Sequence, residues 1–240
     1  MDQILSSLER LKLPGMASCW QSLTETRKTS GLSLNDGLEL LLQAEKDQRE
    51  SSRYTRLLKK GHFRYQASIE EVNVGSARGL DNALVAKLAT GEYIRNGNSV
   101  LITGSTGSGK SFFASALGNR ACKQGYKVAY FNMHKFLLEM KMTRLDGTIL
   151  KFFEKLAKID LLIFDDFGLT RIEGQQQADF LEVIEDRHGK RSTIITSQLP
   201  IAKWFEVIAE ETIADALLDR IVHTSYRFEL ESSNTLRKKL

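Results

Sequence analysis

Cysteine and proline are scarce in this chain of 240 residues, which has two of each. Cys19 and Cys122 lie far apart and form neither a metal-ligand nor a redox spacing, which argues against a disulfide framework and a zinc site. The scarcity of proline leaves long helices uninterrupted. No apolar run approaches the length of a membrane span, and no signal pattern opens the chain, so we expect a cytoplasmic protein without membrane contact.

Strong charge of one sign is also missing. The net charge is +4, which indicates a polyanionic partner only if the basic residues cluster. The four histidines show no ligand spacing. With 42% hydrophobic residues, the chain has enough apolar material for one sizeable core and a smaller appended domain.

The most informative segment is a glycine-rich stretch that matches the phosphate-binding pattern G-x-x-x-x-G-K-[ST] at every fixed position. A short apolar strand precedes it and a helix follows it, as the motif requires. Lys110 can reach the outer phosphates of a nucleotide, and the Ser111 hydroxyl can bind Mg²⁺. The predicted ATP-binding residues here are Gly104, Ser105, Thr106, Gly107, Ser108, Gly109, Lys110, Ser111 and Phe112.

A second motif ends in two carboxylates. Residues 160–166 read Asp-Leu-Leu-Ile-Phe-Asp-Asp, an apolar run typical of a strand buried on both faces of a parallel sheet. At its carboxyl end Asp165 occupies the Walker B position, which helps to hold Mg²⁺. Asp166 is the candidate general base for an attacking water.

The chain separates into two parts. Residues 1–66 have helical periodicity and predict a small all-helical domain, whereas residues 67–240 predict an α/β ATPase domain. In the second part, strands at 100–103, 127–132, 161–165, 192–197 and 227–230 alternate with helices at 110–124, 133–143, 147–157, 174–188 and 212–223. This alternation predicts a parallel five-stranded sheet flanked by helices.

Basic residues gather near the end of the first part, from residue 49 to residue 65, against a single acid, Glu50. The spacing of Arg49, Arg53, Arg56 and Lys60 places them on one helical face, and Arg64 follows. A row of such groups matches the phosphates of a DNA backbone. A solvated helix face would have the same pattern, so the two interpretations remain open.

The β-branched strand 192–197 ends in polar residues. Beside the two nucleotide-binding strands, Thr196, Ser197 or Gln198 can contact the γ-phosphate or the attacking water, and we include Gln198 among the candidate ATP-binding residues.

Together these features resemble the IstB-like ATPases, the transposition helpers of insertion sequences, which are related to DnaC-like helicase loaders. The resemblance runs nearly end to end. Beyond the phosphate loop it includes Leu-Lys-Leu-Pro-Gly-Met at 11–16, Arg-Gly-Leu-Asp at 78–81, Asp-Asp-Phe-Gly at 165–168, Ser-Gln-Leu-Pro at 197–200 and Ala-Asp-Ala-Leu-Leu-Asp-Arg at 214–220.

The resemblance implies a P-loop AAA+ core with a reduced or absent C-terminal lid. It also implies homo-oligomers on double-stranded DNA that deliver this DNA to a cognate transposase. Arg220 stands where AAA+ proteins carry an arginine finger for the neighbouring subunit, and Arg237 is a sensor-2 candidate. Asp166 replaces the glutamate of most AAA+ ATPases, and this shorter carboxylate predicts slow hydrolysis.

Three alternatives remain at this point. The nearest is a DnaC-like loader of a replicative helicase, which preference for single-stranded DNA would favour. The others are a phosphotransfer kinase, for which the sequence offers no acceptor-binding signature, and a module that binds ATP without hydrolysing it.

Overall fold

The computed structural model describes residues 3–27, 31–75 and 79–231, so Arg237 lies outside the described residues. The chain divides into two compact units, Met1–Arg56 and Leu57–Leu240, within one long helix, α3 (Leu34–Gly61). The division falls earlier than the predicted boundary at residue 66. Leu57 is buried, and Phe63 packs against Tyr130, so the segment after Arg56 already belongs to the second unit.

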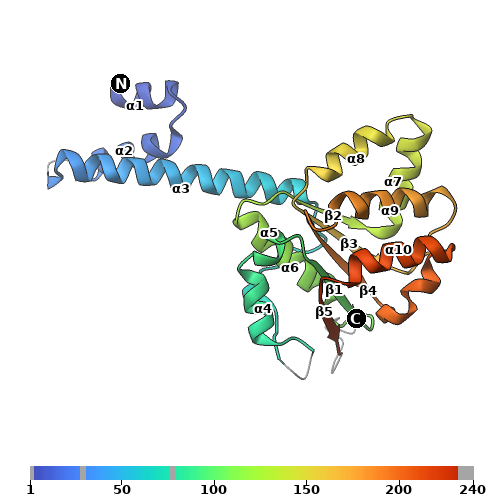
Figure 1. Cartoon of the computed structure of the whole chain (residues 1–240). Coiled ribbons are helices and arrows are strands. Elements are labelled where there is room, and N and C mark those ends of the chain that lie inside the picture. The colour runs from blue at the N-terminus through green and yellow to red at the C-terminus, as the bar shows by residue number, and fades with distance from the viewer. Residues whose placement is uncertain (1–2, 28–30, 76–78, 232–240) are drawn as a thin grey trace, which may run out of the picture. The chain divides into compact units, whose positions relative to one another are not determined.

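The first unit contains α1 (Gln3–Arg10), α2 (Pro14–Glu25) and most of α3 (Figure 1). Pro14 stands in the first turn of α2, where its missing N–H costs no hydrogen bond. A Cβ on Gly15 would lie 2.4 Å from the Ala44 carbonyl oxygen, so the start of α2 approaches the α3 backbone closely. Glu45 of α3 is buried and accepts hydrogen bonds from the amides of Gly15 and Met16 at 2.8 and 3.2 Å. A carboxylate thus caps the positive end of α2.

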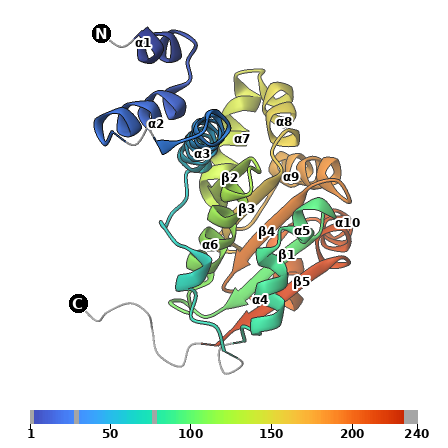
Figure 2. The ribbon, with the colours of Figure 1, turned by 90° about the vertical axis from the view of Figure 1, so that its left-hand side faces the viewer.

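The second unit is built on one parallel sheet in the order β2-β3-β4-β1-β5, as Figure 2 shows. Its strands are β1 (Ser99–Gly104), β2 (Val128–Asn132), β3 (Leu161–Phe167), β4 (Ser192–Ser197) and β5 (Ser225–Leu230). The three central strands are almost completely buried, which explains their continuous apolar sequences. The predicted parallel five-stranded sheet is confirmed.

Helices cover both faces of this sheet (Figure 1). On one face α6 (Lys110–Lys123) crosses the strands, with α4 (Asn82–Ala89) and α5 (Glu92–Arg95) beside it. The other face carries α7 (Met133–Leu145), α8 (Ile149–Ala157), α9 (Gln175–Arg187) and α10 (Glu211–Val222). A cluster of phenylalanines on this second face centres on Phe136, Phe164 and Phe180.

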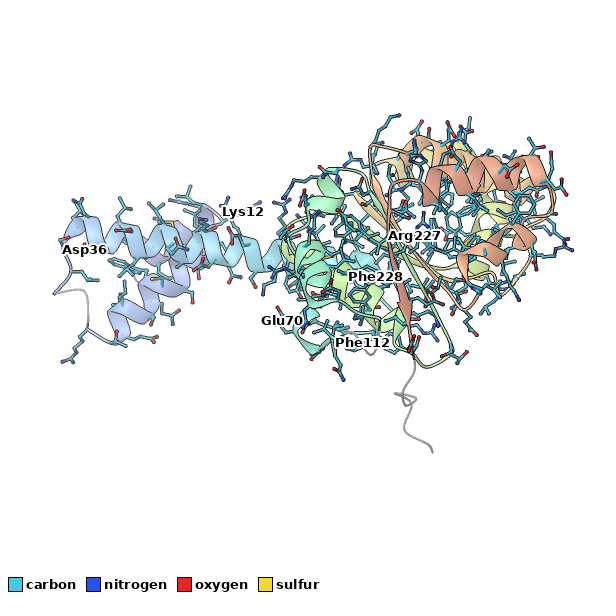
Figure 3. All side chains as sticks on the ribbon, turned by 60° about the horizontal axis from the view of Figure 1, so that its bottom comes forward. Lys12, Asp36, Glu70, Phe112, Arg227 and Phe228 are labelled. Atoms are coloured by element: carbon cyan, nitrogen blue, oxygen red, sulfur yellow. The ribbon has the colours of Figure 1, made fainter. Side chains whose placement is uncertain are left out.

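Two 3-10 helices complete the unit. The 3-10 helix Ile69–Glu71 packs on α6, and Figure 3 shows its Glu70 on the same side of the unit as Phe112 of α6. A second 3-10 helix, Ile201–Val207, buries Trp204 against Phe167. Among the described residues, no helix is both long and apolar enough to cross a bilayer.

Candidate nucleotide-binding site

The strand order brings three predicted motifs to one edge of the sheet. β4 lies between β1 and β3, and all three strands run in the same direction. The phosphate loop follows β1, the two aspartates end β3, and the polar residues end β4. Their carboxyl ends therefore form a single edge, which is where α/β sheets bind ligands.

The phosphate loop has a backbone that only glycine adopts easily. Gly104, Gly107 and Gly109 have φ angles of +144°, +83° and +96°. A Cβ on Gly104 would lie 2.3 Å from the carbonyl oxygen of Leu230, so a side chain has no room there. Helix α6 begins directly after the loop and directs its free N–H groups and positive end toward it. This arrangement suits an anion.

Lys110 is held inside this loop. Its Nζ donates hydrogen bonds to the carbonyl oxygens of Gly104 and Ser105, both at 2.8 Å, and only 6% of the residue is exposed. Burial lowers the pKa of Lys110, and the charges of Asp165 and Asp166 oppose that shift. The ammonium thus lines the cavity that the loop encloses.

A bulge in β3 directs both aspartates to the site. Between Phe164 and Phe167, three steps along β3 match two steps along β4. Asp166 adopts φ +63°, a left-handed conformation that aspartate tolerates better than most residues. In a regular strand consecutive side chains point to opposite faces, but here Asp165 and Asp166 both contact Arg64.

Asp165 is fully buried and accepts hydrogen bonds on both oxygens. Its Oδ1 accepts from Ser111 Oγ at 2.8 Å and from the Thr196 hydroxyl. Its Oδ2 accepts from Arg64 Nη1 at 3.0 Å and from the Tyr130 hydroxyl. Burial and the charge of Asp165 raise the pKa of Tyr130, which keeps the phenol protonated as a donor.

These donors fit a magnesium ion. Mg²⁺ prefers hard oxygen ligands and uses one or two carboxylates together with substrate phosphates. The hydroxyl of Ser111 and the carboxylate of Asp165, the two predicted magnesium ligands, lie 2.8 Å apart beside the phosphate loop. The chemistry of the pair therefore suits the ion that accompanies ATP.

Asp166 differs from Asp165 in its access to the cavity. Its side chain is 20% exposed and lines the cavity, whereas that of Asp165 is 1% exposed. Its Oδ2 accepts hydrogen bonds from Arg64 Nη1 and Asn132 Nδ2, each at 3.1 Å. A carboxylate in this position can accept a proton from a water in the cavity, which is the predicted role of Asp166.

The three polar residues at the end of β4 have separate environments. Thr196 connects the aspartates, because it donates to Asp165 and accepts from the amide of Asp166. The buried Ser197 donates to the carbonyl oxygen of Phe167 at 2.7 Å. Gln198 lines the cavity, and its Oε1 accepts a hydrogen bond from Thr106 of the loop at 2.7 Å. Of the three, Gln198 has the position of a nucleotide contact.

The cavity beside the loop measures about 450 Å³, within the usual range for small-molecule sites. Its lining is mixed. The loop and Asp166 contribute polar groups, Tyr65, Val72, Leu80 and Leu230 contribute apolar ones, and the Tyr65 ring lies 6.2 Å from that of Phe112, centroid to centroid. A nucleotide likewise combines charged phosphates with a largely apolar base. No sequence motif marks these four apolar residues as part of a nucleotide site.

Arg220 lies at the opposite edge of the sheet from the phosphate loop. It is near the end of α10, before β5, and β5 begins opposite Ser99, the first residue of β1. Six strand residues, about 20 Å, separate that edge from the loop. Arg220 pairs with Glu185 of α9 and donates to the carbonyl oxygen of Ala216 at 2.7 Å. It does not contribute to the cavity of its own chain.

The predicted DNA-binding residues separate into groups. Arg53, Arg56 and Lys60 lie on exposed positions of α3. Arg49 donates to Glu45 Oε1 at 2.7 Å, so it also supports the cap of α2. Arg64 lies beyond the end of α3 at Gly61 and lines the nucleotide cavity, so its surroundings differ from those of the other four candidates, and a contact between Arg64 and DNA stays a prediction. Its charge satisfies two carboxylates there, a partnership that spacing along the sequence does not reveal.

The sequence is similar to known insertion sequence ATP-binding proteins. A family model described as "IstB-like ATP binding protein" matches residues 6–240. The protein y4pL of Sinorhizobium fredii, named as an insertion sequence ATP-binding protein, is 39% identical over 234 residues, which cover 98% of this chain and 95% of the relative. The IS1162 protein of Pseudomonas fluorescens, named likewise, is 42% identical over 82% of this chain and 85% of its own length.

Solved structures show the same fold. AMPPCP-bound DnaA from Aquifex aeolicus matches with a TM-score of 0.59 and 25% identity, over 73% of this chain and 53% of the DnaA chain. The DnaC helicase loader matches with a TM-score of 0.57 and 18% identity, over 69% of this chain and 97% of the loader. The second unit therefore has the AAA+ P-loop fold that the sequence predicts.

Proposed function

Because the chain belongs to the IstB-like ATP binding protein family, we propose that it hydrolyses ATP while assembled on duplex DNA and thereby assists a transposase. The observation that carries the proposal is the convergence of the phosphate loop with Asp165 and Asp166. Ser111 Oγ and Asp165 Oδ1 lie 2.8 Å apart although 54 residues separate them along the chain. Such a constellation serves ATP hydrolysis in P-loop proteins.

The chain's own residues supply most of the chemistry. Loop amides and Lys110 bind the outer phosphates, while Ser111 and Asp165 hold the metal. Mg²⁺ held there would supply positive charge that offsets the charge of the phosphates. Asp166 accepts a proton from the attacking water, the bond from the γ-phosphorus to the bridging oxygen breaks, and ADP and phosphate leave. Gln198 orients the water or the γ-phosphate.

Three further features support assembly on DNA. Arg53, Arg56 and Lys60 form a basic face on α3 that suits phosphates of the DNA backbone. Arg220 is remote from the cavity of its own chain, so it serves the site of a neighbouring copy as an arginine finger. The relatives y4pL and the IS1162 protein are named for insertion sequences, which makes a transposase the partner we propose. For a protein that acts on DNA in this way we propose a cytoplasmic location.

The test measures phosphate release from ATP by the full chain alone, with duplex DNA and with single-stranded DNA. We expect slow turnover that duplex DNA stimulates. Lys110→Ala should abolish it, whereas Lys123→Ala, at the exposed end of the same helix, should not.

Each other outcome selects a different function. Stimulation by single-stranded DNA alone would favour helicase loading. Tight ATP binding without any phosphate release would show that the protein is a module that binds ATP and does not hydrolyse it. Transfer of the γ-phosphate to an acceptor would identify a kinase.

A further inference from the structure

The three residues Phe63, Arg64 and Tyr65, which we call the clasp, lie two to four residues beyond the end of α3, and Arg64 and Tyr65 line the nucleotide cavity. Phe63 packs edge-on against Tyr130, with ring centroids 6.3 Å apart. Tyr65 packs against Phe112 of α6. Between these two anchors, Arg64 extends to the aspartates that end β3.

Phe63 holds the clasp backbone in place. A Cβ on Gly118 of α6 would lie 2.3 Å from Cε1 of Phe63, and one on Gly61 would lie 2.4 Å from its Cε2. The ring therefore occupies a slot that exists only because both neighbours are glycines. The part of the clasp that can move is therefore the side chain of Arg64, which is 41% exposed.

Arg64 neutralises both the carboxylate of the proposed metal site, Asp165, and that of the proposed base, Asp166. Its Nη1 lies 3.0 Å from Asp165 Oδ2 and 3.1 Å from Asp166 Oδ2. Two adjacent carboxylates repel each other unless a cation lies between them. Mg²⁺ would provide that cation in the loaded site, and a guanidinium so close to Asp165 Oδ2 opposes a second cation there.

We propose that Arg64 is a positioning residue that occupies the carboxylate pair before Mg²⁺·ATP binds and is displaced when it binds. The inference rests on the proposed function of the site. Its consequence is competition: the guanidinium and the magnesium ion share Asp165, and the charge of each offsets that of the neighbouring Asp166, so each weakens the binding of the other. Because Arg64 lies three residues beyond the end of α3, the exchange also connects the metal site to the helix that carries the basic face.

The experiment titrates Mg²⁺ against binding of a fluorescent ATP analogue to the full chain, without DNA. Parent, Arg64→Ala, Arg64→Gln and Lys59→Ala are compared, since Lys59 is an exposed lysine of α3 and gives the same change in charge. Both Arg64 variants should reach half-saturation at about three- to tenfold lower Mg²⁺, the factor expected for losing two partly exposed ion pairs. Lys59→Ala should match the parent.

Thermal unfolding gives a second readout. Without nucleotide, Arg64→Ala should melt at a lower temperature than the parent because the aspartates lose their cation. Mg²⁺·ATP should remove this difference in melting temperature. In an Asp166→Asn background, the effect of Arg64→Ala on the Mg²⁺ requirement should shrink, because one of the two pairs is already absent.

Three results are decisive. An unchanged Mg²⁺ requirement in both Arg64 variants would overturn the inference. Weaker binding of the analogue at saturating Mg²⁺ would also overturn it and make Arg64 a nucleotide ligand. If the parent fails to bind the analogue at any Mg²⁺ concentration, the proposed function fails instead.

Discussion

The two units of this chain differ in what fixes the positions of their functional side chains. In Leu57–Leu240, buried parallel strands end at one edge and bring distant motifs together. In Met1–Arg56, the described residues bury only Gly15, Ala17 and Glu45, and the described basic residues lie on the surface. Polar side chains that converge at the ends of buried strands have few explanations other than a functional site. Exposed basic side chains on a helix are also explained by contact with solvent alone. Function can therefore be inferred more firmly in the second unit.

The largest expected effect is that of Arg220→Ala. If Arg220 serves a neighbouring site, the variant should bind ATP like the parent but lose DNA-stimulated hydrolysis by about 10³-fold or more. Mixing it with Lys110→Ala protein, each inactive alone, should restore part of the activity at interfaces between the two variants.

Glu185 provides the matched control for this test, because it is the ion-pair partner of Arg220. Glu185→Gln removes the pair but keeps the guanidinium, so it should retain hydrolysis. Equal losses in the two variants, or no recovery on mixing where co-assembly is shown, would make Arg220 a structural residue.

Asp166→Asn should have the next largest effect. Asparagine tolerates the left-handed backbone at this position but cannot accept a proton, so hydrolysis should slow by about 10²- to 10⁴-fold while ATP binding persists. Asp166→Glu restores a carboxylate and should recover activity. If Asp166→Asn hydrolyses ATP at the parental rate in single-turnover measurements, another group acts as the base.

Much of the second unit could be predicted because its signals are strong and local. Each of the five strands lies within two residues of its predicted bounds at either end, since apolar β-branched runs identify buried strands. The convergence of Ser111 with Asp165 follows from parallel strands that share a carboxyl edge. The catalytic and binding roles of these residues remain predictions.

The missed features depend on contacts between distant segments. Nothing in the run Phe-Asp-Asp-Phe reveals the bulge that directs both aspartates to one site. Tyr130 resembles any aromatic residue of a strand, yet its hydroxyl contacts Asp165. Arg64 follows a basic helix and was grouped with its basic residues as a DNA-binding candidate, and the sequence does not reveal its two carboxylate partners 101 and 102 residues away. Local periodicity carries no information on such pairs.

Reversing the charge on α3 tests the proposed DNA contact of its basic face, which is inferred less firmly than nucleotide binding. Arg56→Glu with Lys60→Glu should weaken duplex binding and reduce the slope of log K against log salt by about 2, as expected for two lost phosphate contacts. Arg49 is left intact because it pairs with Glu45. This design separates DNA contact from damage to the cap of α2.

Lys151→Glu with Lys155→Glu on α8 is the control for that measurement, with the same change in net charge at exposed positions outside the predicted track. An equal reduction in slope would show that net charge matters rather than the α3 face. An unchanged slope in the α3 variant would make that face a solvated surface.

The smallest effect on activity should come from Gly15→Ala, which tests whether the two units are independent. An added Cβ would lie 2.4 Å from the Ala44 carbonyl oxygen and 2.6 Å from Glu45 Cα, and backbone atoms cannot move aside cheaply. Overpacking of this kind costs about 1–3 kcal/mol, so α2 should separate from α3 and its amides should exchange faster with solvent.

Gly37→Ala is the matched control within α3. Its Cβ would meet nothing within 4 Å, so it should stabilise the helix by about 0.5–1 kcal/mol. ATP binding in the second unit should be the same in both variants, and weaker ATP binding in Gly15→Ala alone would show that the helical unit acts on the nucleotide site.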